Sequence, residues 1–226
     1  SRRGKGSAKE FVAKYCENYA KTNGRGLICI PSGNHDMDRL ARTLDPEEMK
    51  IAFAFLLSMP GAPFIYYGDE IGMRYVENLT SVEGGYNRTG SRSPMQWNTS
   101  ANAGFSSAPS EKLYVPVDPD RNRPNAENEM ADDTSLYSEV KRLIALRMAH
   151  PALQSMAAIH FLSDGDPLIY ERTCDEEKLL VIIHPADRNV VVPDVKGEIL
   201  YTVGGNASVT GDGIAVDGGT AVFLAL

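Results

Sequence analysis

The segment Gly26-Leu27-Ile28-Cys29-Ile30-Pro31-Ser32-Gly33-Asn34-His35-Asp36 is a short apolar run that ends in three adjacent polar side chains. The run over 27–30 is apolar throughout and is bounded by glycine and proline, which predicts a strand buried on both faces. A buried parallel strand delivers the residues that follow it to a crevice at its C-terminal end, where barrel and doubly wound enzymes place their chemistry. His35 and Asp36 are therefore candidate functional residues. The alternative is that these polar residues only turn the chain and cap the next helix.

The chain around this segment alternates helices and strands. Hydrophobic spacing and capping residues predict two helices and two strands, in the order 8–21, 27–30, 46–59 and 63–67. Asp45 and Glu48 form a capping box for the second helix. The second strand, like the first, ends in polar residues, here Gly68-Asp69-Glu70. Short links between alternating helices and strands are typical of a parallel sheet, so the predicted class of this part is α/β.

The rest of the chain differs in composition and in hydrophobic periodicity. Residues 74–132 are rich in Gly, Asn and Pro with little periodicity, and loops of that length tend to be functional. A third helix is predicted from about Asp133, with Leu136, Val140, Leu143, Ile144 and Arg147 on one face, and it ends before His150-Pro151.

Beyond Met156 short β-rich runs alternate with turn sequences, at 157–162, 168–173, 178–184, 189–192, 197–203, 213–216 and 220–226. This pattern predicts a small antiparallel β-sandwich. The predicted domains are 1–155, which includes the long loop, and an all-β domain at 156–226.

Composition limits the partners and the compartment. The net charge is −7 with 23 basic and 30 acidic residues, which argues against nucleic acid as a partner. No apolar run is long enough for a membrane span, and no signal peptide is visible. Three well-separated cysteines, expected to be buried and unpaired, favour a reduced compartment, and we predict the cytoplasm. Because the chain begins without Met, we expect it to derive from a longer protein.

Several blocks together resemble the alpha-amylase superfamily, glycoside hydrolase family 13. Asn34-His35-Asp36 is similar to the family's motif after the seventh barrel strand, and 67–73 (YGDEIGM) is similar to the segment after the eighth. The block Arg92-Ser93-Pro94-Met95-Gln96-Trp97, with Asn102-Ala103-Gly104-Phe105 after it, resembles the alpha-glucosidase and trehalose synthase branch. The likeness covers about 20–155. It implies the C-terminal part of a (β/α)₈ TIM barrel, followed by the β-sandwich.

The resemblance also implies roles for three residues. Asp36 corresponds to the carboxylate that holds sugar hydroxyls and stabilises the transition state, and His35 to a substrate-binding histidine. Arg92 corresponds to an arginine that helps to hold the non-reducing-end glucose. The implied ligand is a small α-glucoside or oligosaccharide. Neither a cofactor nor a metal site is predicted, and the sequence leaves calcium dependence open.

The sequence departs from the family in one respect. The family's nucleophile and acid/base follow the fourth and fifth strands, and this chain offers only two βα units of the eight in a barrel. We therefore expect the C-terminal part of a retaining glycosidase or glucosyltransferase that is inactive alone. The open barrel strands predict self-association of the isolated chain.

Rival interpretations concern the other polar residues. Asp36 with Asp69 or Glu70 could form a complete carboxylate pair, but Asp69 and Glu70 are expected to be structural, capping a turn or pairing with Arg74 or Arg92. Arg39 either orients Asp36 or forms a surface ion pair.

Two further alternatives stay open. Trp97, like the neighbouring tyrosines at 66 and 67, is core by default, with a sugar platform as the alternative. A non-catalytic amylase-like domain, either a binding module or the partner of a transporter, is the alternative from another class.

Overall fold

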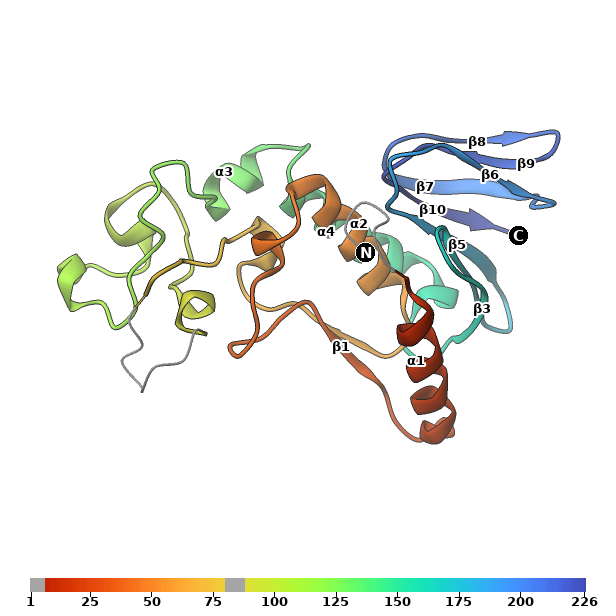
Figure 1. Ribbon diagram of the computed structural model, residues 1–226, viewed down its shortest axis with the longest axis horizontal. Coiled ribbons are helices and arrows are strands. Elements are labelled where there is room, and N and C mark those ends of the chain that lie inside the picture. The colour runs from red at the N-terminus through yellow and green to blue at the C-terminus, as the bar shows by residue number, and fades with distance from the viewer. Residues whose placement is uncertain (1–6, 80–87) are drawn as a thin grey trace. The chain divides into compact units, whose positions relative to one another are not determined.

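The computed structural model describes residues 7–79 and 88–226. Its α-helices are α1 (Lys9–Thr22), α2 (Pro46–Ser58), α3 (Ala126–Ala131) and α4 (Leu136–Ala149) (Figure 1). Its short 3₁₀ helices are η2 (Leu40–Arg42), η3 (Asp69–Ile71), η4 (Thr89–Arg92), η5 (Ala101–Gly104), η6 (Ser110–Lys112) and η7 (Pro151–Leu153). Its strands are β1 (Cys29–Pro31), β2 (Ala62–Phe64), β3 (Ala158–Asp164), β4 (Leu168–Thr173), β5 (Lys178–His184), β6 (Val190–Pro193), β7 (Glu198–Gly204), β8 (Ala207–Thr210), β9 (Gly213–Val216) and β10 (Thr220–Ala225).

The described residues form two compact units that interleave along the sequence. Of the described residues, the strand-rich unit takes 7–30, 50–63 and 142–226. The loop-rich unit takes 31–49, 64–79 and 88–141. The domain boundary expected near Met156 stays a prediction.

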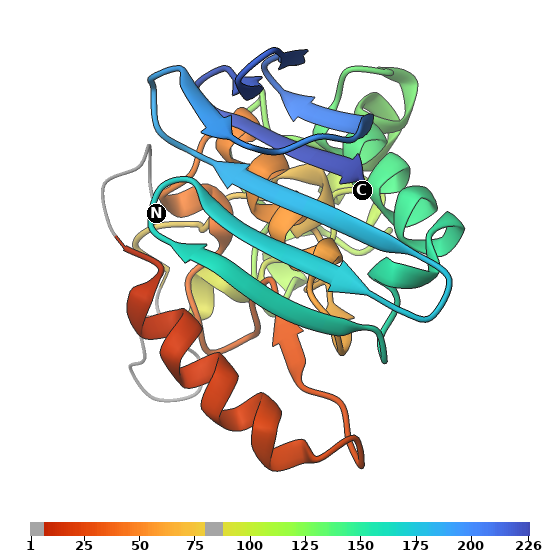
Figure 2. The same cartoon turned by 90° about the vertical axis from the view of Figure 1, so that its right-hand side faces the viewer.

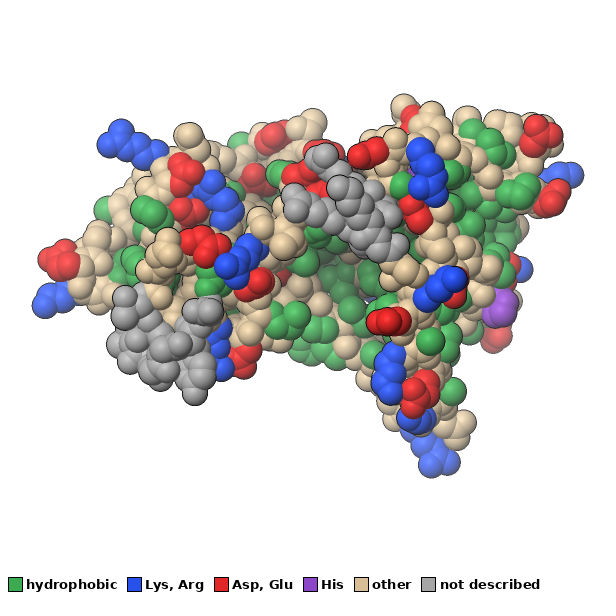
Figure 3. Space-filling view, in the orientation of Figure 1, with side chains coloured by type: hydrophobic (Ala, Val, Ile, Leu, Met, Phe, Trp, Pro, Cys, Tyr) green, Lys and Arg blue, Asp and Glu red, His purple; other side chains and the backbone are tan. Residues whose placement is uncertain are grey.

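Helix α1 confirms the predicted helix over 8–21. Asn23 ends it with a left-handed backbone, φ 47°, and Gly24 continues with φ 69°. Its buried face contacts β3, where the ring of Tyr15 meets Phe161 edge-on at 6.1 Å. Basic and acidic side chains cover its outer face (Figure 3). Cys16 lies exposed and unpaired, so its predicted burial was wrong.

Helix α2 begins with the predicted capping box. The amide of Glu48 donates to Asp45 Oδ1 at 2.9 Å, and the amide of Asp45 donates to Glu48 Oε2 at 3.0 Å. Pro46 occupies the first helical position, where no amide hydrogen is needed. These contacts fix the start of the helix that separates the two short strands β1 and β2.

Strands β1 and β2 pair with each other, at the places that the sequence predicts for its first two strands. The amide of Ala62 donates to the Ile28 carbonyl and that of Ser32 to the Phe64 carbonyl, so pairing advances in the same direction along both strands, as in a parallel pair. Their predicted burial was wrong, because Cys29 and Phe64 are exposed. Among the described residues this sheet has two strands, too few to cover its own faces.

Helix α4 ends at Ala149, before His150-Pro151 as predicted. The predicted apolar face is buried except for Ile144, which is exposed. Within the strand-rich unit, buried Arg147 donates to the carbonyls of Leu57, Met59 and Gly61 at 2.7, 2.7 and 3.1 Å. The guanidinium thereby satisfies carbonyls that the end of α2 leaves unpaired.

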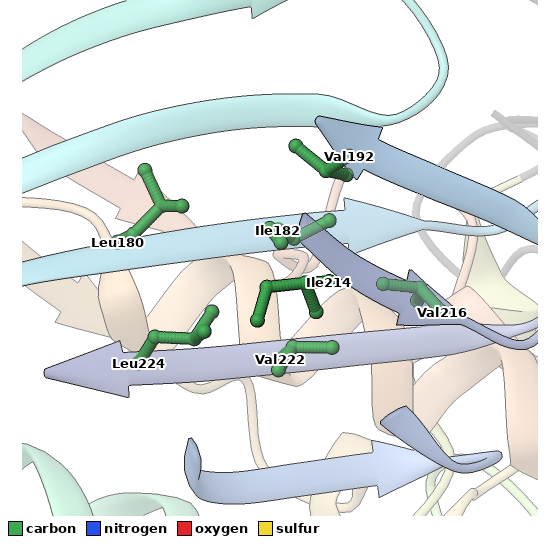
Figure 4. Close-up of a cluster of buried hydrophobic side chains, with 7 residues drawn as sticks. All are labelled: Leu180, Ile182, Val192, Ile214, Val216, Val222 and Leu224. Atoms are coloured by element: carbon green, nitrogen blue, oxygen red, sulfur yellow. The ribbon is translucent and has the colours of Figure 1, made fainter. Parts of the chain in front are cut away.

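The remaining strands form two antiparallel sheets, ordered β3-β4-β5-β10-β7 and β6-β9-β8. Figure 2 shows the strands of the first sheet side by side. Side chains from both sheets meet in one buried cluster (Figure 4), made by Leu180, Ile182, Val192, Ile214, Val216, Val222 and Leu224. Strands form at all seven predicted runs, whereas β8 was missed: it is four residues long, and its last three residues are exposed.

Candidate functional site

The site lies on the turn that follows β1. Asn34 Oδ1 accepts a hydrogen bond from the Asp36 amide at 2.8 Å, and the Asn34 carbonyl accepts from the Met37 amide at 3.2 Å. Asparagine favours such turns because its side chain bonds the backbone two residues ahead. The turn leaves His35 65% and Asp36 47% exposed, so both side chains can reach a ligand.

Two arginines hold the Asp36 carboxylate. Arg88 Nη1 donates to Asp36 Oδ1 at 2.7 Å, and Arg92 Nη2 donates to the same oxygen at 3.1 Å. The other oxygen, Oδ2, lies 3.4 Å from His35 Nε2. Arg92 Nε also donates to the His35 carbonyl at 3.0 Å, which ties the turn to η4. The contacts orient Asp36 through charge-assisted hydrogen bonds.

The structure thus brings His35, Asp36 and Arg92 together, although they come from segments more than 50 residues apart. Sequence reasoning missed Arg88, which contacts the same carboxylate oxygen. Its signal is the spacing to Arg92: the two arginines lie four residues apart at the two ends of a single helical turn, η4.

A second acidic side chain, Asp69, follows β2 but has a different environment. Its carboxylate is fully buried and pairs with the equally buried Arg39, Nη1 to Oδ1 at 3.1 Å. Burial raises the pKa of Asp69, and hydrogen bonding from Ser32 with the charge of Arg39 partly offsets this. Asp69 therefore forms a structural ion pair with Arg39 in this unit and is not an exposed partner for Asp36.

The observed ion pairs correct the expected ones. Arg39 forms neither a contact with Asp36 nor a surface pair, because its guanidinium is buried, pairs with Asp69 and lies over the rings of Tyr66 and Tyr67 at 4.8 and 4.9 Å. Arg74, expected to pair with Asp69 or Glu70, contacts other carboxylates, those of Asp118 and Asp120, at 3.1 and 3.0 Å.

The long loop predicted at 74–132 contains η4, η5, η6 and α3. Residues 80–87 of it lie outside the described residues. Trp97 is held by its backbone, which accepts from the Glu127 amide and donates to the Ala103 carbonyl, at 2.9 and 2.8 Å. Its side chain is half exposed, so the expectation of a core residue was wrong.

A cavity of about 260 Å³ lies elsewhere, in the strand-rich unit, between the end of α1 and Leu27. It is not bordered by His35, Asp36 or Arg92. The Asp36 site is open to solvent instead.

Over residues 7–79 and 88–226, no three His, Cys, Asp or Glu side chains are grouped as metal binding requires. No helix in the same residues has the length and apolar character needed to cross a membrane.

Comparisons with known proteins agree with one another. The family described as alpha amylase, catalytic domain, matches residues 7–156. The trehalose synthase/amylase TreS of Mycobacterium tuberculosis is 39% identical over 137 residues, which is 58% of this chain and 22% of TreS. The oligo-1,6-glucosidase of Parageobacillus thermoglucosidasius is 30% identical over 209 residues, 76% of this chain and 36% of that enzyme.

A solved structure is similar as well. The trehalulose synthase MutB of Pseudomonas mesoacidophila MX-45 superposes with a TM-score of 0.81 at 25% identity, and the match covers 97% of this chain and 47% of that structure. The chain therefore spans less than half the length of each of these relatives.

Proposed function

This chain belongs to the alpha-amylase family, glycoside hydrolase family 13, and from that premise we propose that it carries part of the sugar site of a retaining enzyme acting on small α-linked glucosides. The relatives named trehalose synthase/amylase and oligo-1,6-glucosidase support this substrate class. The observation that carries the proposal is the Asp36 carboxylate, oriented by two arginines and still half exposed.

In this proposal Asp36 stabilises the transition state. Glycoside cleavage flattens the sugar ring and gives it positive charge, and a carboxylate that grips ring hydroxyls binds this form more tightly than the ground state. A sugar hydroxyl can donate to Asp36 while it accepts from Arg88 or Arg92, because a hydroxyl is both donor and acceptor. His35 supplies a further polar contact beside Asp36 Oδ2.

The nucleophile and the general acid are proposed to lie in other segments of the parent protein. A retaining site needs two carboxyl groups about 5 Å apart on either side of the scissile bond. Asp69 is a poor member of such a pair with Asp36, because it is buried and occupied by Arg39 and Ser32. We therefore propose that residues 1–155 contribute the last units of a (β/α)₈ barrel and 156–226 a C-terminal β-sandwich.

Product chromatography tests the proposal. The 226-residue chain and the full-length parent are each incubated with maltose and with a short isomalto-oligosaccharide. We expect turnover by the parent and none by this chain. Internal cleavage of starch by a parent that leaves both small glucosides intact would contradict the substrate class. A parent without turnover on any glucoside would favour the non-catalytic alternative, and turnover by this chain alone would return Asp69 or Glu70 to the catalytic site.

We further propose that the isolated chain self-associates through the open β1–β2 sheet. Phe64 on β2 is 59% exposed, and an exposed strand edge pairs readily with another chain. Sedimentation velocity should show dimers or larger species that Phe64→Lys reduces. Val209→Lys is the matched control, since Val209 is 55% exposed on β8. A monomer at all concentrations would contradict this.

A further inference from the structure

The loop that carries His35 and Asp36 is anchored at both ends to one buried carboxylate. At its start, Ser32 Oγ donates to Asp69 Oδ2 at 2.7 Å. At its end, Arg39 Nη1 donates to Asp69 Oδ1 at 3.1 Å. The two carboxylate oxygens of Asp69 thus hold the first and the last residue of the loop, Ser32 and Arg39.

The carboxylate is itself fixed to the segment after β2. The Asp69 amide donates to the Tyr66 carbonyl at 3.0 Å. Ser32 Oγ accepts from the Tyr66 amide at 2.9 Å, and Arg39 Nη1 donates to the Tyr67 carbonyl at 2.7 Å. Both anchors therefore bridge the loop after β1 and the loop after β2 through the same buried group.

Packing against the turn is close. A Cβ at Gly33 would lie 3.1 Å from Asp69 Oδ2, so a larger residue there would require the carboxylate to shift by a few tenths of an ångström. The side chains of Asp69 and Arg39 are both fully buried, which excludes direct contact with a sugar at the exposed Asp36. Any effect of Asp69 on a ligand is therefore indirect.

We propose that Asp69 is a positioning residue: by holding Ser32 and Arg39, it fixes both ends of the loop and so places Asp36 and His35 for sugar binding and transition-state stabilisation. The inference rests on the proposed function. A shift of about 1 Å in a reacting group can cost roughly 100-fold in rate, whereas the pair itself makes no contact with substrate.

The test compares three single variants of the full-length protein. Asp69→Asn keeps the shape and removes the charge that holds Arg39, and Ser32→Ala removes one anchor and leaves the Arg39–Asp69 pair. Asp118→Asn is the matched control, because Asp118 is a buried carboxylate of the same unit that pairs with Arg74 at 3.1 Å. We expect kcat to fall about 100-fold in Asp69→Asn and about 10-fold in Ser32→Ala, with KM changed less than threefold and Asp118→Asn at the wild-type rate.

A second readout does not depend on turnover. The ring-proton shifts of His35, followed by NMR in the 226-residue chain, should move in Asp69→Asn and Ser32→Ala and stay unchanged in Asp118→Asn.

The outcomes separate this inference from the proposed function. Wild-type kcat and unchanged His35 shifts in Ser32→Ala and Asp69→Asn, in a protein that Asp36→Asn inactivates, would overturn the positioning role alone. Equal losses in Asp118→Asn would also overturn it, since they would indicate general destabilisation. If Asp36→Asn keeps full turnover, the proposed function fails instead. Should Asp69→Asn not fold, Ser32→Ala decides by the same criteria.

Discussion

Asp36 and Asp69 are two aspartates in similar positions along the chain but in opposite environments. Each follows a short strand of the β1–β2 pair, and each contacts arginine at about 3 Å. Asp36 is 47% exposed and shares its charge between Arg88 and Arg92, whereas Asp69 is fully buried against Arg39. A carboxylate that water can reach remains available to a ligand. A carboxylate that water cannot reach stays paired with its arginine, and it contributes by holding the surrounding loops in place.

The energetic consequences differ in the same way. Exposed ion pairs are screened by water and salt and contribute little to stability. Removing one member of a buried pair leaves an uncompensated charge in a medium of low dielectric constant, which is costly. We therefore expect Asp36 substitutions to affect activity and Asp69 substitutions to affect stability as well.

The largest effect is expected on turnover. Asp36→Asn in the full-length protein should lower kcat by about 10³-fold, because the neutral amide no longer favours the positively charged transition state. Its unfolding midpoint should stay unchanged, since the pair is exposed. Steady-state kinetics and urea denaturation measure both. Asp38→Asn is the control, because Asp38 lies on the same loop and pairs with Arg42 at the surface; an equal loss there would assign the effect to the loop and not to Asp36.

The next effect is on stability. Asp69→Ala should lower the free energy of unfolding by about 3–5 kcal/mol, since Arg39 would remain buried without its counter-charge. Asp36→Ala should change it by about 1 kcal/mol or less. Urea denaturation of the 226-residue chain compares the two. Similar losses in both variants would contradict the division into an exposed and a buried pair.

Sequence reasoning found the elements whose local signals are strong. The capping box of Asp45 and Glu48 and the left-handed stop at Asn23 depend on neighbouring residues only, and both form as predicted. Burial of β1 and β2 was overestimated, because an apolar strand is buried only if other elements cover it. Burial of a strand therefore depends on the whole fold and cannot be predicted from the sequence of the strand alone.

For the candidate site, sequence reasoning identified the residues better than their contacts. His35 and Asp36 stand out because a short apolar run ends at them, and the structure joins them to Arg92. Arg88 lies 52 residues from Asp36 in a segment without periodicity, and its four-residue spacing to Arg92 indicates the contact only once Arg92 has been placed beside Asp36. The pairing of Arg39 with Asp69 was also missed, since several arginines are available and spacing does not rank them.

A smaller effect should separate the two pairs by their response to salt. A double-mutant cycle on Asp36 and Arg88 should give a coupling energy of about 0.2–1 kcal/mol at low salt that falls towards zero in 1 M NaCl. The cycle on Asp69 and Arg39 should keep its coupling energy, because buried pairs are poorly screened. A coupling energy between Asp36 and Arg88 that does not change with salt would show that the pair is less accessible to water than its exposed side-chain fractions indicate.

The smallest effect concerns Glu70, beside Asp69. Burial raises its pKa above the ordinary value of 4.5, and its Oε2 is buried without a hydrogen-bond partner. A raised pKa in the folded protein favours folding below 4.5, and this stabilisation is lost as pH rises through the folded pKa. The stability of Glu70→Gln relative to the native chain should therefore increase with pH above 4.5 in urea titrations.

Glu17 on α1 provides a control of opposite sign. Hydrogen bonds from Lys21 and Lys14 lower its pKa, so its carboxylate stabilises the fold above 4.5 and loses this effect as pH falls through the folded pKa. Glu17→Gln should thus lose stability relative to the native chain as pH rises, while Glu70→Gln gains it. Parallel pH profiles for the two variants would mean that burial at Glu70 does not control its protonation.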